Sequence, residues 1–119
     1  MSLGGMRTAR TAIAAAANEV LGPKRCAPFY RSSMRPRDAW VSFSRYDRDD
    51  TGLGFMAAYE VRVALPQDLG DAEEWVTDHS DALVEAIAEQ LIITAVVMVT
   101  LVTDSGNVPG LVVEGVRPH

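Results

Sequence analysis

Hydrophobic and polar positions alternate with two different periods along this chain. From Thr8 to Leu21 apolar residues recur at steps of three and four, which is the spacing of one helix face, and Gly22-Pro23 then gives a stop signal. The same spacing returns from Asp71 to Leu91, and Asp71 is placed to cap that helix. The apolar face of this second segment contains Ala72, Trp75, Val76, His79, Ala82, Leu83, Ala86, Ile87 and Leu91. The pattern therefore predicts two amphipathic helices.

Four other segments have the patterns of β-strands, namely Ala39–Tyr46, Phe55–Leu65, Ile92–Thr103 and Leu111–Val116. Ile92–Thr103 is apolar on both faces for most of its length, so it is either a central strand under two layers or a strand whose second face is covered by another copy of the protein. Pro109 and Gly110 indicate that the last strand starts after them, or begins at an edge or a bulge.

These elements predict an α+β fold in which two helices pack on a four-stranded antiparallel sheet, in the order α-β-β-α-β-β. A length of 119 residues with 48% hydrophobic content suits one domain, 1–119, that buries a single core. We expect residues 1–7 to be flexible and residues 24–38, which lack periodicity, to form a basic loop.

The net charge of −5 conceals an asymmetry between the two halves of the chain. Residues 1–62 carry ten basic and six acidic residues, whereas residues 63–119 carry one basic and ten acidic residues. Opposite charges on two parts of one molecule suit a head-to-tail contact between copies, although both parts could equally be ordinary solvated faces. The candidate intersubunit contacts are Arg31, Arg35, Arg37, Arg48, Glu74, Asp78, Asp81 and Glu85.

The sequence contains no pattern that indicates catalysis or a cofactor. The usual bases are His79 and the terminal His119, and neither stands in a recognisable setting. Gly52-Leu53-Gly54 leads into a strand instead of a helix, so it is not a phosphate-binding loop. We therefore expect a protein that is not an enzyme, with no catalytic residue and no cofactor.

Metal, membrane and nucleic-acid binding receive little support. Asp47, Asp49 and Thr51 alternate as in a calcium loop, but the twelfth position is Ala58 instead of a bidentate carboxylate, so we expect no metal. Ile92–Val102 is too short and too rich in β-branched residues for a membrane helix, which argues against a membrane partner. Residues 24–38 mix arginines with aromatics, as nucleic-acid binders do, yet the pI of the chain is near 4.9. The single Cys26 cannot form an internal disulfide.

Three segments carry a resemblance to a known family. They are Tyr59-Glu60-Val61-Arg62-Val63-Ala64-Leu65-Pro66, the helix around Trp75, and Val99-Thr100-Leu101-Val102-Thr103-Asp104-Ser105-Gly106-Asn107-Val108-Pro109-Gly110-Leu111. With the element order, they resemble the tail terminator (tail completion) proteins of long-tailed bacteriophages over about Ala39 to Pro118. The arginine-rich loop from Lys24 to Arg37 has no counterpart in that family.

The resemblance implies a structural virion protein that forms a ring, typically a hexamer, on the tail tube. Such a ring ends tube growth and provides the surface for head-tail joining. Its partners would be copies of itself, the tail-tube protein, a head-tail connector protein and DNA in the lumen, and it would reside in the tail or neck after assembly in the host cytoplasm. The alternatives are another neck or head-tail connector protein, a tail-tube subunit, or a cytoplasmic nucleic-acid-binding α+β domain.

Overall fold

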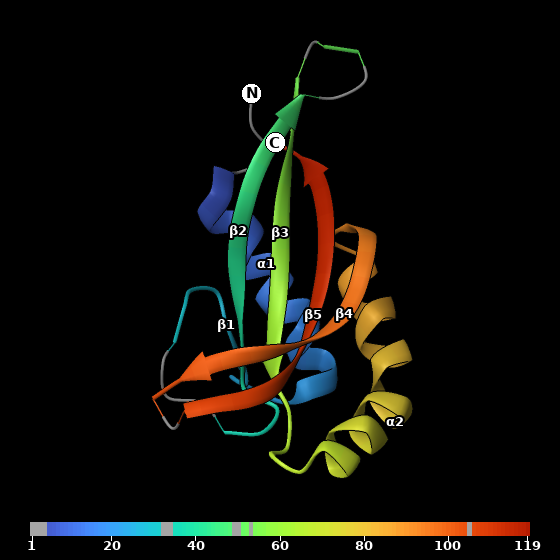
Figure 1. The fold of residues 1–119 in the computed structure, drawn as a ribbon. Helices are drawn as coiled ribbons and strands as arrows, with labels where there is room; N and C mark the ends of the chain where they lie inside the picture. The colour runs from blue at the N-terminus through green and yellow to red at the C-terminus, as the bar shows by residue number, and fades with distance from the viewer. Residues whose placement is uncertain (1–4, 32–34, 49–50, 53, 105) are drawn as a thin grey trace.

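Two α-helices and a five-stranded mixed sheet make up this α+β fold, in the order α-β-β-β-α-β-β (Figure 1). The computed structural model describes residues 5–31, 35–48, 51–52, 54–104 and 106–119. The elements are α1 (Gly5–Leu21), β1 (Cys26–Ala27), β2 (Ala39–Arg48), β3 (Phe55–Ala64), α2 (Leu69–Ala88), β4 (Ile92–Thr103) and β5 (Gly106–Pro118). The predicted α+β class with two helices is confirmed, and the sheet has one strand more than predicted.

The additional strand is β1, which pairs in parallel with the start of β2. The sheet is therefore mixed and not wholly antiparallel, which corrects the prediction. A strand of two residues is too short to show an alternating hydrophobic pattern in the sequence, and contacts with α1 hold it in place. The Asn18 side chain accepts a hydrogen bond from the Cys26 N–H at 2.6 Å and donates one to the Cys26 carbonyl oxygen at 3.2 Å.

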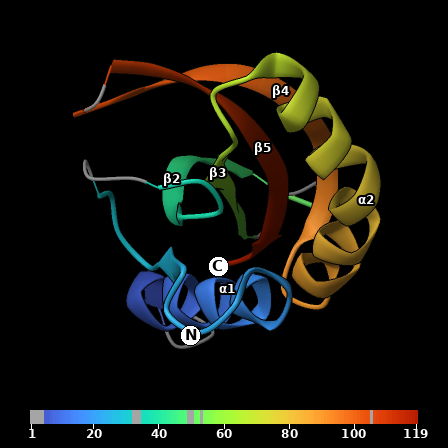
Figure 2. The same cartoon turned by 90° about the horizontal axis from the view of Figure 1, so that it is seen from below.

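Both helices cover the same face of the sheet. The sheet order is β1-β2-β3-β5-β4; α1 contacts β1 and β2, α2 contacts β4 and β5, and the helices contact each other. Figure 2 shows α1 and α2 next to each other along this face of the curved sheet. Between the layers lies the main core, whose largest fully buried members include Ile13, Val41, Tyr59, Val61, Val63, Leu83, Ile87, Leu111 and Val113.

The helix boundaries differ from the predicted ones at three ends. α1 begins at Gly5, so residues 5–7 are helical and not flexible as expected, while residues 1–4 lie outside the described part of the chain. α2 begins at Leu69 and ends at Ala88, earlier than predicted at both ends. Its N-cap is Asp68 and not Asp71, because the Asp68 carboxylate accepts a hydrogen bond from the Asp71 N–H at 3.0 Å.

β5 starts before the predicted residue and includes both Pro109 and Gly110. The Leu65 N–H donates a hydrogen bond to the Pro109 carbonyl oxygen at 2.9 Å. In an antiparallel strand the nitrogen and the carbonyl oxygen of one residue point to the same side, so both backbone groups of Pro109 face away from β4. The missing N–H of proline therefore removes no hydrogen bond between β5 and β4. Gly110 is required by close packing, since a Cβ there would lie 2.6 Å from Cδ1 of Leu101.

The β4–β5 hairpin bends across the face of the sheet that the helices leave open (Figure 1). Its distal half encloses a second, smaller core of Trp40, Ala64, Leu101 and Val108, with Val99 against it. Leu101 is 2% exposed although it belongs to the outermost strand. Leu101 and Val108 of the hairpin are thereby fixed against the start of β2.

β4 lies at the edge of the sheet, so the first of the two alternatives for this strand, a central position under two layers, is wrong. Its bounds, Ile92–Thr103, are those predicted. Large apolar side chains of β4 remain in contact with solvent, and their exposed fractions are 61% for Ile92, 72% for Val102 and 40–42% for Val96, Val97 and Met98. Coverage of this strand by another copy stays a prediction.

Candidate functional site

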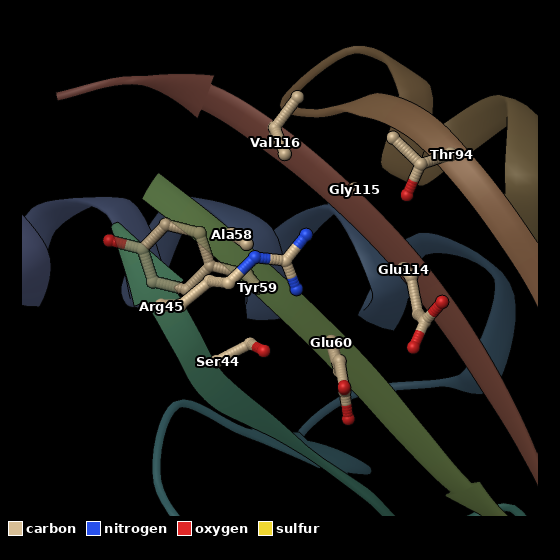
Figure 3. Close-up of a pocket in the computed structure, with 9 residues that line it drawn as sticks. All are labelled: Ser44, Arg45, Ala58, Tyr59, Glu60, Thr94, Glu114, Gly115 and Val116. Atoms are coloured by element: carbon tan, nitrogen blue, oxygen red, sulfur yellow. The ribbon is translucent and has the colours of Figure 1, made fainter. Parts of the chain in front are cut away.

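A small polar hollow lies on the open face of the sheet, between β2, β3, β5 and the start of β4 (Figure 3). It has a volume of about 100 Å³, and it is lined by Ser44, Arg45, Ala58, Tyr59, Glu60, Thr94, Glu114, Gly115 and Val116. Glu60 and Glu114 are direct partners in the β3–β5 register. Arg62 donates to Glu60 at 2.6 Å, so an ion pair already occupies one of the two carboxylates.

The lining of this hollow includes neither histidine of the chain. His119 lies against Tyr46, with ring centroids 4.7 Å apart. His79 is exposed, and its ring stacks on the ring of Trp75 one helical turn earlier, with ring centroids 4.8 Å apart. The prediction that His79 lies on the apolar face of the helix is therefore wrong. The hollow therefore brings carboxylates and an arginine together without a histidine base, and the expectation of a non-enzyme stays a prediction.

Metal ligation is not supported by the described residues. Within those ranges no group of three or more His, Cys, Asp or Glu side chains is placed to hold a metal ion. In the calcium-like segment, Asp47 pairs with Arg45 at 2.8 Å, and Asp49 lies outside the described residues. Cys26 is buried, and this burial raises the pKa of its thiol to about 12 in spite of the nearby Arg31 charge.

The basic loop is organised around one buried carboxylate, that of Asp38, which is 7% exposed. Its oxygens lie 3.1 Å from Arg25 Nη1 and 3.9 Å from Arg31 Nη2, and the Arg35 N–H donates to Oδ2 at 3.0 Å. Burial alone would raise the pKa of Asp38, but these hydrogen bonds and the two positive charges outweigh it and lower the pKa. The sequence contained a signal for this arrangement, because Asp38 is the single acidic residue of the basic segment 24–38.

Basic side chains remain in excess over this anchor. An open hollow of polar character is lined by Pro23, Lys24, Arg25, Arg31, Arg35 and Asp38, that is, by four cations and one carboxylate. Lys24 and Arg37 adopt positive φ values of 61° and 74°, a region that L-residues other than glycine rarely occupy. Of the candidate contacts, Arg31, Arg35 and Arg37 thus lie in one loop.

Arg48 is separate from the other basic candidates. It lies at the far end of β2, where its guanidinium stacks over the Phe55 ring at 5.2 Å and donates to the Gly52 carbonyl oxygen at 3.1 Å. The loop is at the opposite end of that strand, next to Ala39. The structure therefore does not bring Arg48 together with Arg31, Arg35 and Arg37.

The four acidic candidates, Glu74, Asp78, Asp81 and Glu85, are all exposed on α2. α2 contains six acidic residues and no lysine or arginine. It packs beside β4 and β5, whereas the basic loop contains β1 and leads into β2, so the two charged surfaces lie at opposite edges of the sheet (Figure 2). Among the described residues, no ion pair joins the loop to this helix.

The exposed edge strand completes the candidate site. We name Ile92, Val96, Val97, Met98 and Val102 the β4 surface. It follows the strand from its start beside the acidic helix into the distal half of the hairpin, which crosses the open face of the sheet (Figure 1). The sequence indicated that this strand needs a second cover, but did not indicate that it is an edge. In the part of the chain that the structure describes, no helix is long and apolar enough to cross a membrane.

The comparisons with known proteins add no relative to this picture. No protein-family model matches the chain, and no curated protein matches it in sequence.

Proposed function

We propose that this protein is a structural phage subunit that assembles with its own copies into a ring on the tail tube, ends tube growth and provides the head-tail joining surface. The observation that carries the proposal is the β4 surface, an uncharged and exposed strand edge beside a strongly acidic helix. The resemblance of Tyr59–Pro66 and Val99–Leu111 to tail terminator proteins supplies the tube as the partner.

An interaction surface explains β4 better than a ligand site does. Edge strands of proteins that stay monomeric are usually short or protected by lysine, proline or a covering segment. β4 is twelve residues long and contains no charged residue and no proline. Its exposed apolar side chains are of the kind that mark protein-protein contacts.

The two different surfaces on opposite edges support a head-to-tail contact, which is the kind of contact that a ring needs. A contact between unlike surfaces repeats from copy to copy and closes into a ring when the rotation allows it. Acidic α2 at one edge and the basic loop at the other provide the attraction and the register for such a contact. The hexameric number, the connector protein and DNA in the lumen as partners, and the place in the tail or neck come from the family resemblance.

A second candidate function is nucleic-acid binding, and the hollow lined by Lys24, Arg25, Arg31 and Arg35 favours it. Four cations around one open space suit phosphate groups. The net charge of −5 opposes that function for the molecule as a whole. Another neck or connector protein, or a tail-tube subunit, is the alternative within the same setting.

The test is tube length. Tail-tube protein polymerised with this protein is expected to give shorter tubes, with extra density at one end in negative-stain electron microscopy. Bovine serum albumin at the same concentration is the control. Tubes of unchanged length and bare ends, together with salt-dependent retention of the protein on a DNA column, would replace this proposal with the nucleic-acid one.

A further inference from the structure

We propose that the β4 surface and the acidic face of α2 in one copy dock onto the basic loop of the next copy, in a head-to-tail contact. The partner is a second copy of this chain, and the loop surface consists of Lys24, Phe29, Tyr30, Arg35 and Arg37. The inference rests on the proposed function only for closure into a ring; the contact itself is argued from the described residues.

Both surfaces combine an apolar centre with charges, and the charges are of opposite sign. The first has the exposed side chains of β4 beside a helix with six acidic residues. The second exposes Phe29 (41%) and Tyr30 (64%) among five basic residues of the segment 24–37. Apolar groups can therefore meet apolar groups while the flanking charges attract one another.

Backbone polar groups of β4 also face this contact. The Pro109 carbonyl oxygen is directed to the β3 side, where it accepts from Leu65. Its register partner Thr100 therefore directs its own N–H and C=O away from β5, toward the free edge, and strand alternation gives Met98 and Val102 the same direction. Arginine and lysine side chains are donors that suit the outward carbonyl oxygens.

A symmetric contact of β4 with β4 is disfavoured by charge. A two-fold axis through that edge would place the acidic helices of both copies near each other, because α2 packs beside β4 and β5. Each helix carries six acidic residues without a basic one, so the two would repel. Contact with the basic edge of the next copy replaces that repulsion with attraction.

The loop surface is already held in shape. Asp38 forms ion pairs with Arg25 and Arg31. The guanidinium groups of Arg7 and Arg10 both contact the Phe29 ring, each with its central carbon 5.0 Å from the ring centroid. Tyr30 packs edge-to-face on the buried Trp40, with ring centroids 5.2 Å apart. A surface ordered before association loses less entropy when it binds.

The test uses two variants that each remove one surface. Met98→Lys places a cation on the β4 surface, and Lys24→Glu with Arg35→Glu reverses the loop; all three positions have solvent-exposed side chains. Light scattering is expected to show assembly of the unmodified protein and the monomer mass of 12.9 kDa for each variant alone. A one-to-one mixture should give twice that mass and no more, because one intact surface of each kind remains.

Other results of the same measurements would overturn the contact. A loop variant that still dimerises alone indicates a β4–β4 contact, and unmodified protein that stays monomeric, or a mixture that does so, removes the contact altogether. Met98→Glu is the matched control: it should assemble better than Met98→Lys, since the proposed partner is basic. Tubes of unchanged length despite this pattern would reject the proposed function and leave the contact standing.

Discussion

Arg25 Nη1 lies 3.1 Å from Oδ1 of Asp38, and this pair ties the basic loop to the start of β2. The same residue, Asp38, donates its backbone N–H to the Arg35 carbonyl oxygen at 2.9 Å and accepts from the Ala64 N–H at 2.8 Å. A single buried acidic residue thus connects the loop, β2 and the end of β3. The shape of the proposed loop surface depends on it.

Asp38→Asn is expected to lower the free energy of unfolding by about 1–3 kcal/mol, because it leaves two arginines without their charged partner. The arginines are partly exposed and regain some hydration, which limits the loss. Urea titration followed by circular dichroism measures the change. Asp47→Asn is the control: its pair with Arg45 is exposed, so its effect should be at most about 0.5 kcal/mol. Equal effects of the two substitutions would contradict the anchoring role.

The stability of the protein should depend on pH through the same carboxylate. Its pKa is lowered in the folded state, so its contribution is complete above the unfolded pKa of about 3.9 and is lost as the pH falls through the folded value. The difference in unfolding free energy between the unmodified protein and Asp38→Asn should be constant from about pH 5 to 8 and shrink below about pH 4. A difference that persists undiminished at low pH would show that charge is not its source.

Asp68→Ala and Asp71→Ala should separate a helix cap from a first-turn acid. Loss of the Asp68 cap should cost about 1 kcal/mol, because the Asp71 N–H loses its acceptor. Asp71→Ala should cost less, about 0.3–0.5 kcal/mol, through the helix dipole alone. Added salt should reduce the second effect more than the first. Thermal unfolding at low and high salt gives both values, and the reverse ranking would restore Asp71 as the cap.

Gly110→Ala is expected to destabilise the small core under the β4–β5 hairpin by about 1–3 kcal/mol, because the new methyl group collides with Leu101. Leu101→Ala alone should also destabilise, by about 2–5 kcal/mol. The double variant should lose less than the sum of the two, since the smaller side chain makes room. Additive losses in a double-mutant cycle would show that the two positions do not compete for space.

Native Cys26 should resist alkylation. Its thiol is buried, and a pKa raised to about 12 leaves almost no thiolate near neutral pH. Reaction with iodoacetamide at pH 8 should be at least about 100 times slower in native protein than in urea-unfolded protein. Mass spectrometry of time points gives both rates, with free cysteine as the standard. Similar rates in the two states would mean that the region around β1 opens readily.

The elements that could be predicted from the sequence are those whose pattern is local. Helical spacing identified both helices, and the bounds of β4 follow from its apolar run between Leu91 and Asp104. The same run is compatible with a central strand and with an edge strand, because the distinction depends on how distant segments pair. β1 likewise could not be predicted from the local sequence pattern, because contacts with distant residues, Asn18 and the start of β2, hold it in place.

The candidate site was predictable to the same degree. The spacing of Glu74, Asp78, Asp81 and Glu85 placed them on one exposed helix face, as found. Charge counts could not show that Arg48 lies at the other end of β2 from the basic loop, nor that Asp38 gathers two of the arginines. These are consequences of tertiary position, which composition does not record.

Lys24 and Arg37 have a left-handed backbone conformation, which is energetically unfavourable for a residue with a side chain. Glycine would adopt φ values of 61° and 74° without strain, whereas a side chain there costs about 1 kcal/mol per residue. The chain nevertheless carries a cation at both positions. The folded chain is therefore less stable than the same backbone would be with glycine at these two positions, and positive charge is kept there at the expense of stability.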